Sequence, residues 1–212
     1  MKDLSVFTTE NGAASLTLRE IPSRRRAYIL IRSSEAPEQL LEECASFCKA
    51  CGAEAIYAAG HPILERYPLH TAILRMSGSR DDLPESDAAL FPVQAHTAET
   101  WRRIYNEKMA SVDNAAYLTA EDAKKAARAG EAYFVHRDGV LLGIGSICGE
   151  QLKAIASVLP GQGETVLCAL NHAMGGERIT LEVASTNKRA IRLYERLGMI
   201  ATGEAARWYK II

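Results

Sequence analysis

The chain has 212 residues, of which 48% are hydrophobic and 24% charged, a balance typical of a globular protein that buries a core. Its formal net charge of -1 argues against a broad nucleic-acid-binding surface, because phosphate binding requires a concentrated basic field. The sequence contains no run of about 18 apolar residues and no apolar signal segment at its start, so we expect a cytoplasmic protein without a membrane span.

The N-terminal part of the chain predicts alternating short strands and helices. The β-rich runs Ser15–Glu20 and Ala27–Arg32 precede a stretch with helical spacing from Pro37 to Ala50. Two further β-rich runs, Ala53–Ala59 and His70–Met76, enclose a short helical piece. The end of the chain repeats much of this order, which indicates a partial internal repeat.

Three cysteines in the predicted helix, Cys44, Cys48 and Cys51, have a spacing that iron–sulfur sites also use. The same positions share one apolar helical face with Leu40 and Leu41. A free cysteine behaves as a small hydrophobic residue, so we expect these thiols in the core and no metal site. The alternative, an iron–sulfur protein, would show visible absorbance and bound iron.

A polar segment from Ser77 to Ala88 contains Gly and Pro and has no hydrophobic periodicity, as is typical of a linker. We therefore expect three parts: an N-terminal part over residues 1–76, the linker over 77–88, and a longer C-terminal part over 89–212.

The C-terminal part predicts strands and helices that alternate towards its end. The expected strands are Phe91–Ala95, Ala132–His136, Leu141–Cys148, Leu152–Leu159 and Ile179–Ala184, followed by strands near the C-terminus. The expected helices are Ala98–Ala110, Thr119–Ala129, Glu164–Met174 and Lys188–Leu197.

The stretch LEVASTNKRAIRLYERLGM, residues 181–199, places three polar groups in one strand–turn–helix unit. Side chains alternate along a strand, so Glu182 faces away from Leu181. Asn187 lies at a natural helix-capping position, and Tyr194 lies on the same helical face roughly 10 Å further along. Each also has a structural explanation: a solvated glutamate, a helix cap and a packed tyrosine.

This unit resembles the C-terminal motif of the GNAT N-acetyltransferase superfamily, and the segment Ala206–Ile211 resembles the family's last strand. The strand order from Phe91 onward is similar to the complete family fold. The resemblance implies an α/β (α+β) fold, with a mixed central sheet flanked by helices over residues 89–212. Residues 1–76 would then form a partial GNAT-like half.

The resemblance implies transfer of an acetyl group from acetyl-CoA to an amine by direct attack in a ternary complex. Glu182 matches a position that serves as general base in some members, and Tyr194 matches the tyrosine that protonates the leaving thiolate. Asn187 matches the asparagine that contacts CoA. The acceptor would be a small-molecule or peptide amine, and the reaction needs no metal.

The family's pyrophosphate loop corresponds to a shortened segment after the strand Leu152–Leu159. The implied cofactor-binding residues are Val158, Gly161, Gln162, Gly163, Glu164, Thr165 and Asn187. Backbone N–H groups at a helix start bind phosphates, but Pro160 removes one donor and Glu164 adds an opposing charge. These departures leave an alternative: a degenerate GNAT domain that binds a ligand or partner without catalysis.

We expect no second CoA site in residues 1–76. In the proposed repeat, Leu64 stands where Tyr194 stands, and the loop from Arg32 to Pro37 contains no glycine.

Overall fold

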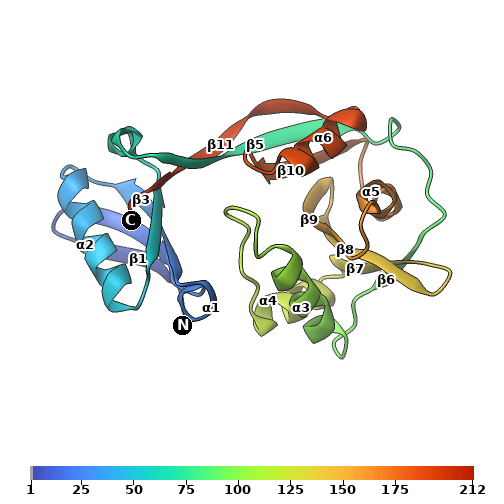
Figure 1. Ribbon diagram of the computed structural model, residues 1–212, viewed down its shortest axis with the longest axis horizontal. Helices are drawn as coiled ribbons and strands as arrows, with labels where there is room; N and C mark the ends of the chain where they lie inside the picture. Colours follow the sequence, from blue (N-terminus) through green and yellow to red (C-terminus); the bar gives the residue numbers. More distant parts are fainter. Residues whose placement is uncertain (1) are drawn as a thin grey trace. The chain divides into compact units, whose positions relative to one another are not determined.

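A computed structural model describes residues 2–212 and divides them into two compact units (Figure 1). The first unit contains the chain up to Ile73 together with Glu204–Ile212, and the second contains Leu74–Gly203. The chain passes from one unit to the other within strand β5 (Leu69–Ser79) and returns within strand β11 (Ile200–Lys210). None of the described helices is long and apolar enough to cross a membrane.

The first unit is a sheet packed against one long helix. Its other elements are β1 (Leu4–Thr9), β2 (Gly12–Thr17), α1 (Ile21–Arg24), β3 (Arg26–Ser33), α2 (Pro37–Ala50), β4 (Ala55–Ala59) and the 3-10 helix η1 (Pro62–Arg66). Strand β2 pairs antiparallel with both β1 and β3. Strand β3 pairs parallel with β4, and β4 pairs antiparallel with β11. Leu40, Cys44 and Cys48 of α2 pack on this sheet, so the cysteines lie in a hydrophobic core. Burial raises the pKa of Cys44 to about 11 and that of Cys48 to about 12.

The second unit has helices on both faces of a mixed sheet. Its elements are β6 (Ala89–Pro92), α3 (Ala98–Lys108), α4 (Ala120–Arg128), β7 (Ala132–Arg137), β8 (Val140–Cys148), β9 (Gln151–Ser157), α5 (Gly163–Asn171), β10 (Arg178–Ala184) and α6 (Lys188–Arg196). The strand order is β5-β10-β9-β8-β7-β6, with β6 to β9 antiparallel and β9 parallel to β10.

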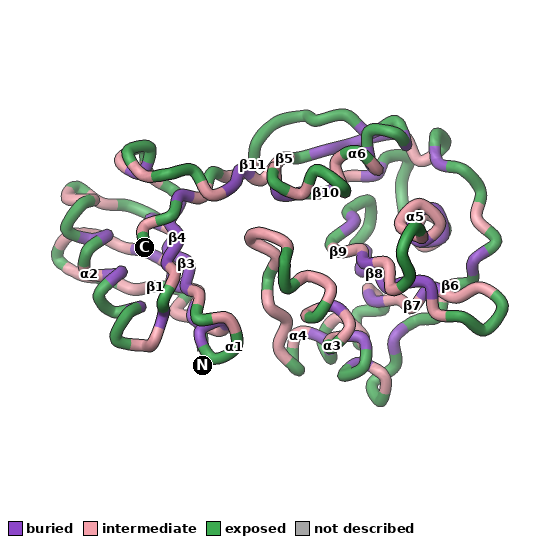
Figure 2. Tube along the Cα trace, viewed as in Figure 1, coloured by how far each residue is buried: buried purple, intermediate pink, exposed green. Residues whose placement is uncertain are grey.

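Two β-bulges, one at Leu142 of β8 and one at Lys153 of β9, change which face of the sheet the side chains of each strand point to. Leu142 and Leu152 belong to the core beneath α5 and α6, whereas Ile144 and Ala156 belong to the core beneath α3 and α4. Regular alternation would place residues two or four positions apart on the same face, so the extra residue in each strand accounts for the change of face. Figure 2 shows the resulting buried stretches along β8. The predicted mixed sheet flanked by helices is therefore confirmed.

The observed units differ from the predicted boundaries at the expected linker. Residues Ser77–Ser79 continue β5, and Ser77 is buried and accepts hydrogen bonds from Arg178. Arg80 then binds the side-chain and main-chain oxygens of Asn171 at distances of 2.8 and 2.7 Å. Polar composition predicts a loosely held linker, but these specific side-chain contacts anchor the segment to the second unit.

Three features of the first unit and the C-terminus also differ from the sequence expectations. The edge strand β1, in which no residue is fully buried, and the single-turn helix α1 are too short or too weakly patterned to give a periodic signal. The expected group of C-terminal strands is a single strand, β11, which contributes its last residues to the first unit.

Candidate functional site

Strands β9 and β10 separate soon after they meet. They pair only at Thr180 with Gln151 and at Leu181 with Leu152, although β9 runs on to Ser157. Beyond Leu152, β9 keeps its pairing with β8 but has no pairing with β10 in the described chain. An edge of β9 therefore presents backbone N–H and C=O groups that this sheet does not use.

A β-bulge marks the point where the two strands separate. Ser146 pairs with Ala154 and Ile147 pairs with Leu152, which leaves Lys153 as an extra residue on β9. A bulge bends its strand and increases the local twist, so it directs the rest of β9 away from β10. The Lys153 ammonium lies 3.1 Å from a carboxylate oxygen of Glu131, which helps to hold the bulge in place.

The loop after β9 leads directly into the N-terminus of α5. Val158 N–H donates to the Leu142 carbonyl at 2.8 Å, and the first bond of α5 runs from Val166 N–H to the Gln162 carbonyl at 2.9 Å. No side chain caps this helix, and no described group accepts a hydrogen bond from the N–H of Gly163, Glu164 or Thr165. Free N–H groups at the positive end of a helix dipole favour an anion.

The two glycines of this loop have different structural roles. Gly161 has a φ of 81°, a left-handed conformation that glycine adopts without steric cost. A Cβ atom at Gly163 would lie 3.2 Å from Cδ2 of Leu193, so the missing side chain allows α6 to approach the start of α5 closely. Glycine at both positions thus keeps the backbone of the loop compact and brings α6 beside it.

Arginine and lysine side chains beside the loop offset the charge that the sequence predicted as unfavourable. The Arg196 guanidinium on α6 lies 3.3 Å from a Glu164 carboxylate oxygen, and the Lys108 ammonium on α3 donates to the Val158 carbonyl at 3.3 Å. Neither residue was expected at the site, because both are distant from the loop in sequence. The i, i+3 and i, i+4 spacings predict contacts only within one helix, so they do not indicate contacts between distant segments.

Tyr194 is buried, with 5% of its surface exposed, in the core that also contains Val166 and Leu181. Burial raises its pKa to about 12. Its hydroxyl makes no hydrogen bond with another described residue. The phenol is therefore protonated at neutral pH and has a proton to donate.

Asn187 caps α6, as its position predicts: its side-chain oxygen accepts from the Ala190 N–H at 3.2 Å. The preceding residue, Thr186, donates its hydroxyl to Asp113 at 2.8 Å. The segment between α3 and α4 therefore contacts the turn that begins the helix carrying Tyr194. Sequence patterns did not indicate Asp113, which lies in an irregular segment.

Glu182 lies on the other face of β10 from this core. Its neighbours Leu181 and Val183 are buried with Tyr194, whereas its own side chain is 49% exposed and lies 3.6 Å from the Arg75 guanidinium. The structure thus brings Tyr194 and the loop residues together through α5 and α6. It places Glu182 on the opposite face of the sheet.

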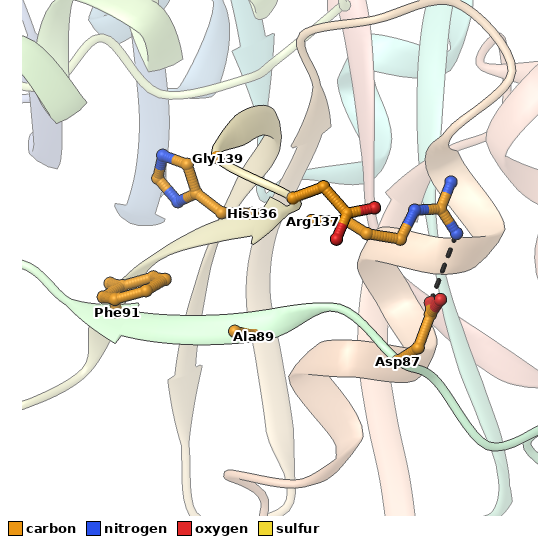
Figure 3. Close-up of a pocket in the computed structure, with 7 residues that line it drawn as sticks. Asp87, Ala89, Phe91, His136, Arg137 and Gly139 are labelled. Carbon is orange, nitrogen blue, oxygen red and sulfur yellow. Dashed lines mark hydrogen bonds and ion pairs between the residues drawn. The ribbon is translucent and has the colours of Figure 1, made fainter.

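A cavity of about 580 Å³ is found elsewhere in the second unit, between the segment through β6 and the end of β7 (Figure 3). None of the residues that the sequence predicts for the site lines it. Within the described residues, no group of three or more His, Cys, Asp or Glu side chains is arranged to hold a metal ion.

No family model and no curated protein matches the chain. Solved structures do match its fold. A GCN5-related N-acetyltransferase from Sphaerobacter thermophilus is 11% identical over 93% of this chain and 75% of its own, with a TM-score of 0.59. A GCN5-related N-acetyltransferase from Kribbella flavida is 13% identical over 96% of this chain and 58% of its own, with a TM-score of 0.61.

A third similar structure is described as a tandem GNAT protein from the clavulanic acid biosynthesis pathway. It is 14% identical over 94% of this chain and 78% of its own, with a TM-score of 0.53. At these identities the likeness establishes the fold.

Proposed function

Because the chain has the fold of the GCN5-related N-acetyltransferases, we propose that it transfers an acetyl group from acetyl-CoA to an amine. The acceptor is a small-molecule or peptide amine that attacks the thioester directly. The observation that carries this proposal is the unpaired edge of β9, which leads into the uncapped start of α5.

These two features complement the two ends of an acyl-CoA molecule. The pantetheine arm contains amide groups, which can pair with the free edge of β9 from Ala154 to Ser157 as an added strand would. The pyrophosphate carries negative charge, which the N–H groups of Gly163, Glu164 and Thr165 can bind. Val158, Gly161 and Gln162 shape the loop between the two, and Asn187 stands at the start of the adjacent helix.

Tyr194 serves as the general acid in this proposal. Its proton is retained at neutral pH because burial raises its pKa to about 12. The ordinary pKa of a thiol is about 8.5, so proton transfer from a phenol to a solvated thiolate would be unfavourable. Burial also disfavours a thiolate, which raises its proton affinity and brings donor and acceptor closer in strength.

Glu182 serves as the general base, on the side from which the amine approaches. The amine loses its proton at the nitrogen, whereas the leaving sulfur gains one, so acid and base need not share a face of the sheet. The partly exposed Glu182 carboxylate can receive the proton directly or through water. Its ion pair with Arg75 is exposed and contributes little to stability, so it leaves the carboxylate free to move.

One observation favours the second candidate function, a non-catalytic GNAT domain that binds a ligand or partner. Tyr194 is packed in the core, as a purely structural tyrosine would be. Packing requires only the ring of Tyr194, whereas catalysis also requires its hydroxyl.

Calorimetric titration of the full chain with acetyl-CoA tests the proposal. We expect binding at roughly micromolar to sub-millimolar strength, because several N–H groups remain although the loop is short. A titration with no heat, together with no thermal shift at millimolar ligand, would leave only the non-catalytic function.

A further inference from the structure

The cavity in Figure 3 has the size of a small-molecule site and is separate from the proposed acyl-transfer site. Its volume of about 580 Å³ lies within the usual range for such pockets. Its walls include Asp87 and Phe91 from the segment through β6, and His136, Arg137 and Asp138 from the end of β7 and the turn after it.

Two aromatic rings form one end of this cavity. Phe91 is 52% exposed, and the His136 imidazole is perpendicular to its ring, with ring centroids 5.2 Å apart and an interplanar angle of 86°. Figure 3 shows the two rings one above the other, away from the ion pair of Arg137 and Asp87. Contact with a partner that shields this aromatic ring from water would lower the free energy.

Pairing of a further strand with β6 does not explain why Phe91 is exposed. β6 is the last strand of its sheet and contains only four residues, Ala89–Pro92. Pro92 has no N–H to offer a further strand, and proline on an edge strand is a usual means of preventing such pairing. The occupant of the cavity is therefore better sought among small molecules.

The charges around the cavity favour a cation. Arg137 and Asp87 neutralise each other, with 3.2 Å between the guanidinium nitrogen and the carboxylate oxygen. Among the described residues Asp138 has no ion pair, so the lining carries one excess negative charge when His136 is neutral. Nδ1 of His136 is buried, and no described group forms a hydrogen bond with it. A neutral imidazole nitrogen in that position can accept from an ammonium N–H.

We propose that this cavity binds a small organic ammonium ion with an apolar body. The cation lies against the face of Phe91, where the ring quadrupole attracts it, and Asp138 supplies the opposing charge. The ammonium N–H donates to Nδ1 of His136 after a small rotation of the ring. The site is independent of acetyl transfer, and its occupant need not be the acceptor amine.

The test uses N,N-dimethylbenzylammonium, a tertiary ammonium that cannot become a stable amide. Titration by calorimetry and by ¹H–¹⁵N NMR should show binding about tenfold tighter than that of benzyl alcohol or phenylacetate, which present the same ring without a cation. NMR shifts should be centred on Phe91, His136 and Gly139. Phe91→Ala and Asp138→Asn should each weaken binding at least about threefold.

The controls separate local binding from a general effect on the fold. Val140→Ala truncates a residue that is 49% exposed on the adjacent strand and does not line the cavity, so binding should be unchanged. Asn tolerates the left-handed backbone of Asp138, whose φ is 53°, so Asp138→Asn should fold normally. Equal binding of phenylacetate, no binding at millimolar probe, or full binding by Phe91→Ala would overturn the proposal.

Discussion

At the scale of single residues, the surroundings of Tyr194 determine what its phenol can do. The ring is packed among apolar side chains, and no described group competes for the hydroxyl. Burial raises the pKa of Tyr194 to about 12, so at neutral pH the side chain is a hydrogen-bond donor with its proton in place. A role in the reaction should therefore appear when charge develops on the sulfur, and not when the substrate binds.

Tyr194→Phe should lower kcat by roughly 10- to 100-fold while the Kd for acetyl-CoA changes by no more than about twofold. Phenylalanine keeps the buried ring and removes only the hydroxyl, so packing is preserved. Steady-state kinetics with an identified acceptor, together with calorimetry, measure the two quantities. Tyr57→Phe, a buried tyrosine of the first unit, is the matched control and should leave kcat unchanged. Equal kcat in the parent and Tyr194→Phe would show that Tyr194 only fills the core.

The raised pKa of Tyr194 also predicts a loss of stability in alkali. Below pH 10, its ordinary pKa, both the folded and the unfolded chain hold the proton; above it, only the unfolded chain releases it. The free energy of unfolding should therefore fall by about 1.4 kcal/mol per pH unit from pH 10 towards 12 on account of this residue. Urea unfolding at several pH values should show a smaller decline for Tyr194→Phe. An equal decline of the free energy of unfolding with pH in the two proteins would contradict the raised pKa of Tyr194.

At the scale of elements, hydrophobic periodicity was enough to place most helices and strands. Helix α2 has the predicted bounds, Pro37 to Ala50, because Pro starts it and a continuous apolar face of leucines and cysteines supports it. The separation of β9 from β10 could not be predicted, since both strands have ordinary patterns and pairing is a non-local property. For the same reason, Arg196 and Lys108 could not be predicted at the site, because their contacts with the loop depend on how α6 and α3 pack.

The ion pair between α6 and the start of α5 leads to a test of the loop. Arg196→Glu should weaken acetyl-CoA binding by about tenfold at low salt, because Glu164 and the new carboxylate would both repel the phosphates. The effect should shrink as the salt concentration rises. Arg103→Glu makes the same charge change at an exposed position of α3 and should have little effect. Similar losses in the two variants, measured by calorimetry, would mean that the loop does not bind the phosphates.

At the scale of the whole molecule, the two units differ at their parallel strand pairs. In the first unit β3 and β4 pair without a break from Arg26 with Ala55 to Leu30 with Ala59, so no free edge opens between them. Helix α2 follows Ala36 and begins with Pro37, which has no N–H to donate. Glu38 adds a negative charge at the same helix end, which the guanidinium of Arg66 offsets as Arg196 offsets Glu164. The free strand edge on which the proposed CoA site of the second unit rests is therefore lacking among the described residues of the first.

We accordingly expect one acetyl-CoA per chain. Calorimetry with the full chain at known active concentration measures the stoichiometry, and NMR should place the shifted amides in α5, α6 and β9. Saturation at two acetyl-CoA per chain, or shifts centred on the start of α2, would contradict this expectation.

The passage of the chain between the units has a consequence for its synthesis. Strand β4 pairs with β11 through Ala58 and Tyr209, and residues 204–212 belong to the first unit. A ribosome adding about 5 to 20 residues per second needs on the order of ten seconds or more to travel from one strand to the other. During that time the partner edge of β4 has no strand from its own chain. The first unit therefore cannot complete its sheet until residues 204–212 have been made, although its other strands are made before the second unit.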